Sequence, residues 1–366
     1  MDEWFGFGYE GTAGERCDIA VVLKLRELPE FAELSRTRVQ ALIEAGGVLY
    51  DGKEIPRGQK KLRPGMHVEV NLTRLRELLR PPALEHIEPL DLPLEFMHTD
   101  EHIAVVVKPP GLSVHPSATE HGPTLTAALL HHLGKLSDMS NAAGRPGIVH
   151  RLDKETSGLL VVARDNAAHA ALSRQFANRV VEKEYLALCI DPPGEPTGRI
   201  DSPIERHPRQ RQRMWSRGGG RSALTEYRLA EMWGPLALLD VSIHTGRTHQ
   251  IRVHLLEAGA CILGDEKYSA GRNASLFKFL RRSAERATGS SLGGQSVSRA
   301  WREACPDESL RHELLRIIEE YPGIFLHAKR LAIMHPATGK RMEFTSQPPH
   351  AWQLIRELFP AQAGKG

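Results

Sequence analysis

The chain has 366 residues, of which 41% are hydrophobic and 25% are charged, and its formal net charge is +3. This length favours more than one domain, and the composition excludes a fibrous or largely disordered chain. The start, MDEWFGFGYEG, lacks the basic segment and apolar core of a secretory signal, and no run approaches the roughly 20 apolar residues of a membrane span. We therefore expect a cytoplasmic protein with no membrane segment.

The first part of the chain predicts a small domain. Residues 1–16, rich in glycine and glutamate, predict an N-terminal arm, and a compact α+β unit is expected over 17–80. The segment DIAVVLKLRELPEF predicts a helix, and SRTRVQALIEAGG predicts a second helix that begins after the N-cap Ser35. VLYDGKEI predicts a hairpin with an Asp-Gly turn, and RPGMHVEVNL predicts one more strand. Consecutive prolines indicate a linker at 81–92.

A larger unit is expected over 93–360. HIAVVVKPPG, GLLVVAR, EKEYLALCI and ALLDVSIHT predict strands, whereas 166–179 and RTHQIRVHLLEAG predict helices. Because strands and helices do not alternate regularly, we expect an α+β fold with a mixed, mostly antiparallel central sheet. Residues 271–320 are Ser/Gly-rich between charged helical segments, which predicts a surface insertion forming a solvated helical lobe.

The stretch GIVHRLDKETSGLLVVARD, residues 147–165, places Asp153 in a short polar turn between apolar segments. Asp153 could cap this turn through the amides of Thr156 or Ser157, and the local pattern alone favours that interpretation. Alternatively, the rigid flanking segments present the carboxylate to a substrate. Arg151 lies two residues earlier, so both side chains share a face if the segment is extended.

A second candidate is the loop–helix junction in HTGRTHQIRVH, where the guanidinium of Arg247 can bind a phosphate or a carboxylate. His244, His249 and His254 are five residues apart and do not align on one helical face, so we expect structural or RNA-facing histidines and no zinc site. The four scattered cysteines contain no CxxC pair. We therefore expect no metal site.

Two basic segments favour a nucleic-acid partner over a membrane. ERHPRQRQRMWSRGGGR, residues 205–221, combines arginines with an aromatic side chain, a pattern typical of sites for phosphates and exposed bases. A solvated basic loop is an equal alternative. RGQKKLR is a second basic segment, in the first unit. The RNA-binding candidates are Arg36, Arg38, Lys60, Lys61, Arg206, Arg209, Arg211 and Arg213.

HRLDKETSG resembles the signature of the RluA-type pseudouridine synthases: His-Arg-Leu-Asp, two residues, then Thr-Ser-Gly. VVVKPPGLSVHP, KEYLAL, TGRTHQIRVHL, GDEKY and LHAKRLAIMHPATG are similar to further blocks of that family and follow its order over about 105–345. SRTRVQALIEAGGVLYDGKEI resembles the S-four RNA-binding domain, which often precedes this catalytic domain.

The resemblance implies the pseudouridine synthase fold and the cofactor-free isomerisation of uridine in RNA to pseudouridine. By position it makes Asp153 the catalytic carboxylate, either as nucleophile or as base. It makes Tyr185 the tyrosine that packs against the target base, and Arg247 the arginine that pairs with Asp153. A charge pair of this kind favours the ionised carboxylate.

The same resemblance makes Arg151 the side chain that fills the space of a flipped uridine, because a planar guanidinium can replace part of the lost stacking. Lys183 and His150 are expected to support the site, and Leu331 to line the base pocket. The insertion at 271–320 departs from the family pattern and bears on the choice of substrate.

The expected substrate is large-subunit ribosomal RNA, by analogy with the family and its S-four domain. A transfer-RNA target is the alternative within the same chemistry, and a non-catalytic RNA-binding factor of ribosome assembly is the alternative outside it. We further expect a monomer, with the S-four unit and Arg206–Arg221 holding the RNA from two sides.

Overall fold

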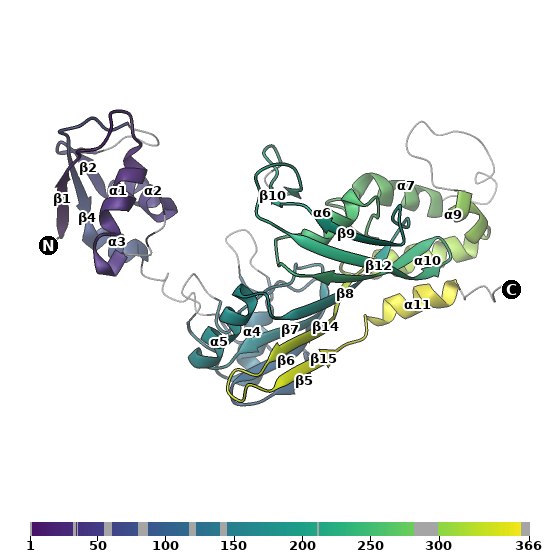
Figure 1. Cartoon of the computed structure of the whole chain (residues 1–366). Helices are drawn as coiled ribbons and strands as arrows, with labels where there is room; N and C mark the ends of the chain where they lie inside the picture. Colours follow the sequence, from purple (N-terminus) through teal and green to yellow (C-terminus); the bar gives the residue numbers. More distant parts are fainter. Residues whose placement is uncertain are drawn as a thin grey trace. The chain divides into compact units, whose positions relative to one another are not determined.

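The computed structural model describes residues 2–31, 34, 36–54, 61–79, 87–116, 122–139, 145–210, 212–281 and 299–359 (Figure 1). The chain forms two compact units, one within Met1–His86 and the other in the described residues from Ile87 onward. No helix in the described ranges is long and apolar enough to cross a membrane.

The first unit packs three α-helices against a small antiparallel sheet of order β1-β4-β2-β3. Its elements are β1 (Trp4–Gly8), α1 (Cys17–Leu25), the 3-10 helix η1 (Pro29–Phe31), α2 (Arg36–Glu44), β2 (Val48–Tyr50), β3 (Lys53–Glu54), β4 (His67–Asn71) and α3 (Leu72–Leu79). The predicted Asp-Gly hairpin is confirmed, because Asp51 and Gly52 both have positive φ, 47° and 75°. Apolar residues of the helices and strands enclose a separate core.

The first residues of the predicted N-terminal arm form a strand of the first unit. Residues Trp4–Gly8 form β1, which pairs with His67–Asn71 of β4 over its whole length. Alternating aromatic and glycine residues suit an edge strand whose aromatic side chains lie on one face. The predicted N-cap Ser35 lies outside the described residues.

The second unit is built on a mixed sheet of order β5-β6-β7-β14-β8-β13-β12-β9, with β15 added to β14. The strands are β5 (Glu95–Thr99), β6 (Ile103–Lys108), β7 (Ser157–Ala163), β8 (Glu182–Cys189), β9 (Thr197–Asp201), β12 (Leu224–Trp233), β13 (Leu236–Ile243), β14 (Leu326–Met334) and β15 (Arg341–Thr345). Only the β7–β14 pairing in this sheet is parallel. The predicted α+β class with a mostly antiparallel sheet is therefore confirmed. A separate ribbon joins β10 (Glu205–Arg206) to β11 (Met214–Trp215).

Side chains of the central strands alternate between two cores. On β8, Tyr185 and Ala187 belong to the core that also contains residues of α4 (Leu125–Leu133) and α6 (Gln250–Glu257). Leu188, from the opposite face of β8, packs with the C-terminal helices. This period of two is the expected signature of a strand covered on both faces. A further core lies between β7 and α5 (Asn166–Ala177).

The segment predicted to be a solvated lobe contributes to a core instead. It contains α7 (Ala270–Leu280), α9 (Arg299–Ala304) and α10 (Glu308–Glu320), which pack with α11 (His350–Leu358) near β8 and β12 (Figure 1). Trp301 and Leu314 are buried, and the indole Nε1 of Trp301 donates to the carbonyl of Ile190 at 3.2 Å. The prediction of a solvated lobe was wrong because it relied on the charged residues of these helices and did not take their apolar face into account.

Candidate active site

Asp153 lies in the turn that leads into β7, and backbone hydrogen bonds fix that turn. The amide of Thr156 donates to the carbonyl of Asp153 at 3.1 Å. Lys108, fully buried at the end of β6, donates from Nζ to the carbonyl of Lys154 at 3.0 Å. The carboxylate thus stands on a loop whose backbone is anchored at the neighbouring residue, so its position does not depend on a bound ligand.

The glycine of the Thr-Ser-Gly triplet is Gly158, and its backbone and surroundings explain why a glycine is needed there. Its φ is +114°, and a Cβ atom there would lie 2.4 Å from the carbonyl oxygen of Ala328 on β14. Only glycine permits both this backbone conformation and this approach of β7 to β14. The triplet therefore shapes the scaffold beneath Asp153.

The guanidinium of Arg252, on α6, holds the carboxylate of Asp153. Arg252 is buried, and its Nε and Nη2 donate to the two oxygens of buried Asp265 at 2.7 and 2.8 Å. This bidentate pair leaves Nη1 facing Asp153 Oδ2 at 3.4 Å and Glu155 Oε2 at 3.5 Å. Burial alone would lower the pKa of Arg252, but its hydrogen bonds to Asp265 and the nearby carboxylates raise that pKa instead. A permanent positive charge therefore stands beside Asp153.

The expected pairing of Arg247 with Asp153 is corrected by this geometry. Arg247 stays in the loop before α6, where its Nε donates to the carbonyl of Ser222 at 3.2 Å. Arg252, five residues further along, reaches Asp153 because it projects from the first turns of the helix. Arg247 still lines the pocket beside Asp153, so it remains a candidate for substrate contact.

His249 lies between Asp153 and a hydrogen-bonded chain. Its Nε2 lies 3.9 Å from Asp153 Oδ2, and its Nδ1 lies 2.7 Å from the hydroxyl of Tyr268. The amide of Met214 donates to that hydroxyl at 2.7 Å, which leaves the hydroxyl proton for Nδ1 and favours a neutral imidazole with its proton on Nε2. Burial lowers the pKa of His249, although the charge of Asp153 acts in the opposite direction.

A pocket of about 100 Å³ lies beside Asp153 and also has Arg151, Tyr185 and Arg247 in its wall. The structure thus brings four residues predicted from the sequence into one site. This volume is below the roughly 300 Å³ at which pockets for drug-sized ligands begin, so the pocket suits one small planar group. Burial, and then the charge of Asp153, raise the pKa of Tyr185, which keeps its hydroxyl protonated. The guanidinium of Arg151 is exposed.

Lys183 and His150 are not among the residues that line this pocket. The Nζ of Lys183 lies 5.8 Å from the ring centroid of Phe176, and the imidazole of His150 stacks on the same ring at 4.5 Å. Burial lowers the pKa of Lys183 to about 8 and that of His150 to about 3. His150 Nε2 accepts from the amide of Val161 at 3.0 Å, so its neutral form ties the loop before Asp153 to β7.

The expectation that Leu331 lines the base pocket is wrong. Leu331 is buried in the core between β7 and α5, together with Val161 and Ile333. Leu326, at the start of the same strand, lines the pocket instead. The two leucines are five residues apart on β14 and belong to cores on opposite faces of the sheet.

The predicted RNA-binding residues of the first unit have different surroundings. Arg36 donates from Nε to Asp18 at 2.8 Å, and Arg38 donates to the carbonyl of Leu78 at 2.9 Å. Both therefore stabilise the unit itself. Lys61 is exposed, and Lys60 lies outside the described residues.

The arginine-rich segment of the second unit forms the ribbon β10–β11 and its loop. Arg206 and Arg209 are exposed, whereas Arg213 stacks over the ring of Tyr268 at 5.2 Å. Arg211 lies outside the described residues. Because Tyr268 also contacts His249, this segment borders the Asp153 site.

Three residues of the site were not singled out from the sequence: Arg252, Asp265 and Tyr268. All three lie in the blocks TGRTHQIRVHL and GDEKY, so the family resemblance covered them. The available signal was an acid directly after the apolar residues CIL and a glycine, since a buried carboxylate needs a cationic partner. That partner, Arg252, lies 13 residues earlier and became evident only from the fold.

Comparison with known proteins places this geometry in a family. The sequence model of the protein family described as RNA pseudouridylate synthase matches residues 102–257, which contain Asp153, Tyr185 and Arg252. An RNA pseudouridine synthase of Aquifex aeolicus is 43% identical over 332 residues, which are 90% of each chain. The ribosomal large subunit pseudouridine synthase D of Zymomonas mobilis is 37% identical over 89% of this chain and 90% of its own.

A plant protein, RNA pseudouridine synthase 2, chloroplastic, of Oryza sativa, is 32% identical over 89% of this chain and 76% of its own. These relatives confirm the resemblance to the RluA-type enzymes drawn from HRLDKETSG and the blocks that follow it. The chain therefore belongs to the RNA pseudouridylate synthase family and is an isomerase that converts uridine in RNA to pseudouridine.

Proposed function

We propose that the substrate is large-subunit ribosomal RNA and that Asp153 is the catalytic carboxylate. One observation carries the catalytic part: a carboxylate on an anchored loop faces a small pocket, 3.4 Å from a buried guanidinium that another carboxylate already holds in place. The ribosomal target is supported by relatives named for the large ribosomal subunit.

The reaction breaks the bond between ribose C1′ and N1 of uracil and forms one between C1′ and C5; C5 loses its hydrogen as a proton and N1 gains a proton, so the product is an isomer of the substrate. No redox partner is needed. Asp153 is suited to this step as nucleophile at the sugar or as base for a proton. Arg252 keeps the carboxylate ionised and aimed, and the protonated hydroxyl of Tyr185 lies in the wall where the detached base would rotate.

Site mapping in cells tests the target. Ribosomal and transfer RNA from a strain that lacks this protein would be compared, by pseudouridine-specific chemistry, with RNA from the parent strain. We expect pseudouridines to disappear at defined positions of the large-subunit RNA and to return with the wild-type protein. Loss of sites from transfer RNA alone would contradict the ribosomal assignment.

We also propose that the first unit, over residues 17–80, is an S-four-like RNA-binding domain. Its own core supports an independent module, and exposed basic residues such as Lys61 supply charge for phosphates. A chain without residues 1–80 should bind RNA more weakly. The salt slope is the slope of log K for RNA binding against log salt concentration, and each lost phosphate contact should reduce its magnitude by about 0.7 to 0.9. An unchanged slope would contradict this role.

The setting we propose is the cytoplasm, with the protein acting as a monomer. The four cysteines are buried and free, which suits a reducing compartment. Light scattering of the purified chain should give a mass near 40.7 kDa, and a mass twice that value would contradict the monomer.

A further inference from the structure

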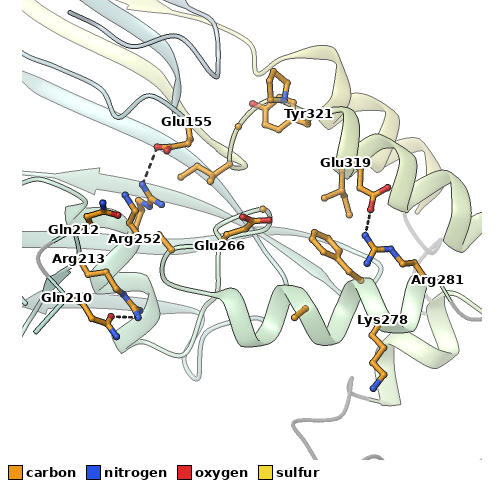
Figure 2. A pocket seen from close by; sticks show the side chains of 18 residues that line it. Glu155, Gln210, Gln212, Arg213, Arg252, Glu266, Lys278, Arg281, Glu319 and Tyr321 are labelled. Carbon is orange, nitrogen blue, oxygen red and sulfur yellow. Dashed lines mark hydrogen bonds and ion pairs between the residues drawn. The ribbon is translucent and has the colours of Figure 1, made fainter. Parts of the chain in front are cut away.

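A large open cleft lies next to the small Asp153 pocket. Its volume is about 1230 Å³. Figure 2 shows Arg213 and Arg252 at one end, Arg281 and Glu319 at the other, and Glu266 between them. One wall is formed by α7 and α10, so the insertion that departs from the family pattern builds this cleft.

The cleft adjoins the Asp153 pocket, and one residue lines both. Arg252 lines both the cleft and the Asp153 pocket. Glu155, two residues after Asp153, lines the cleft and lies 3.5 Å from Arg252. The two pockets therefore meet at Arg252, so an RNA whose reacting nucleotide enters the small pocket lies next to the larger cleft.

The lining of the cleft is chemically mixed in a way that suits a nucleic acid. Its cations outnumber its carboxylates: Arg213, Arg252, Lys267, Lys278 and Arg281 against Glu155, Glu266 and Glu319. Cations bind phosphates, and carboxylates can accept hydrogen bonds from the amino groups of bases. The half-buried ring of Phe277 adds an aromatic surface in the same wall, and bases stack on such rings.

The size of the cleft argues against a small metabolite. Its volume exceeds the roughly 1,000 Å³ at the upper end of pockets for drug-sized ligands, and the lining offers cations at both ends. Arg281 forms an ion pair with Glu319, and Arg213 donates from Nη1 to Gln210 Oε1 at 3.0 Å, so partners hold the cations at both ends of the cleft.

We propose that this cleft binds a single-stranded RNA segment next to the target uridine and so contributes to the choice of site. The inference rests on the proposed action on RNA at Asp153. It assigns substrate contacts to the end of α7, where Lys278 and Arg281 bind phosphates of the flanking strand, and to Arg213, which binds phosphates nearer to the reacting nucleotide.

The test compares two RNAs made from a mapped site: a stem-loop that ends with its stem, and the same stem-loop with single-stranded extensions on both sides. The double variant K278A/R281A should raise KM several-fold on the extended RNA and leave kcat unchanged. Its salt slope should fall by about 1.5, for two lost phosphate contacts. On the short stem-loop it should match the wild type.

The matched control is R299A/R316A, which removes two exposed arginines from α9 and α10 outside the cleft. It loses the same charge and should behave as the wild type on both RNAs. A photo-crosslinker in place of the exposed Ala274 of the cleft wall gives a second readout, and we expect crosslinks to nucleotides outside the stem-loop.

Equal KM values for K278A/R281A and the control, together with no crosslink from Ala274, would overturn the proposal. An equal loss on both RNAs would overturn the assignment to the flanking strand. Failure of the wild-type protein to modify either RNA would instead contradict the proposed function, and crosslinking would then still report whether RNA occupies the cleft.

Discussion

Arg252 carries out two tasks that a single point charge could not combine. Its Nε and Nη2 bind Asp265, while Nη1 faces Asp153 and Glu155. The planar guanidinium therefore holds Nη1 toward Asp153, because rotation of the group would break the two short hydrogen bonds to Asp265. The position of the charge beside Asp153 is thus set by a carboxylate that never meets the substrate.

Replacing Arg252 by lysine tests this division of tasks. R252K keeps a charge but cannot bind Asp265 bidentately and face Asp153 at once, so kcat should fall by about a hundredfold. Binding of RNA should change little. Single-turnover rates and RNA titration measure the two effects separately.

The matched control is R330K. Arg330 on β14 also bridges several carboxylates, among them Glu184 at 2.8 Å and Glu343 at 2.8 Å, but it lies outside the Asp153 pocket. Its replacement should leave kcat at the wild-type value. A rate for R252K as high as that of R330K would contradict the role given to Arg252.

At the scale of elements, the start of α6 decides which arginine reaches Asp153. His249 has φ +56°, a left-handed conformation, and caps the helix. Gln250 fixes the preceding turn, since its Oε1 accepts from the amide of Arg247 at 3.0 Å. The chain therefore turns sharply between Arg247 and Arg252, and the two guanidinium groups point to different partners.

The sequence predicted the helices and strands around this turn but not the contacts that the turn creates. Periodicity predicted α6, α5, β7 and β8 because their apolar patterns are local. The structure adds the cap of α5: the side chain of Asp165 accepts a hydrogen bond from the amide of Ala168. Contacts between distant segments, such as Arg252 with Asp153, depend on turns whose backbone angles the pattern does not contain.

The same limit applies to the edges of each unit. The pairing of Trp4–Gly8 with β4 joins segments about 60 residues apart, and the sequence offered no turn signal to connect them. The core of α7, α9 and α10 was missed because its apolar residues pack on β8 and β13, which lie far away in the chain. Asp153, Tyr185 and Arg151 could be assigned to one site in advance because they lie in recognisable family blocks.

Gly158 offers a test of the contact between β7 and β14. G158A places a Cβ 2.4 Å from a backbone carbonyl at φ +114°, so it should destabilise the second unit by about 3 kcal/mol or more. Urea unfolding followed by tryptophan fluorescence measures the change.

The control is G259A, just after α6. Gly259 also has a positive φ, +82°, but no atom lies within 4 Å of the added Cβ. Only the backbone strain applies there, and its replacement should cost about 1 kcal/mol. Equal losses for the two variants would show that the close approach to Ala328 does not matter.

For the whole molecule, buried histidines predict loss of stability in acid. Burial lowers the pKa of His115 and His327 to about 4 and that of His150 to about 3. As the pH falls below about 6.5, the unfolded chain takes up protons that the folded chain does not, so the free energy of unfolding decreases. Above that pH their stabilising effect is complete.

The variant H327Q isolates one of these groups. His327 lies between the hydroxyl of Ser157 and that of Ser346, each at 2.9 Å from a ring nitrogen. Glutamine does not titrate, so the loss of unfolding free energy between pH 7 and pH 4.5 should be smaller in H327Q than in the wild type. Replacing the exposed His312 by glutamine should leave that loss unchanged. If the unfolding free energy of H327Q fell by as much as that of the wild type between pH 7 and pH 4.5, His327 would not be one of the groups responsible for the loss.

The central claim is that Asp153 performs the isomerisation of uridine. Formation of the C1′–C5 bond releases the hydrogen of C5, so RNA labelled with tritium at C5 of uridine reports turnover directly. The isosteric variant D153N preserves the fold and RNA binding, and D91N changes an exposed aspartate elsewhere in the second unit. We expect tritium release by D153N to fall by at least about a thousandfold, with wild-type release by D91N. Release by D153N at the wild-type rate would contradict the account.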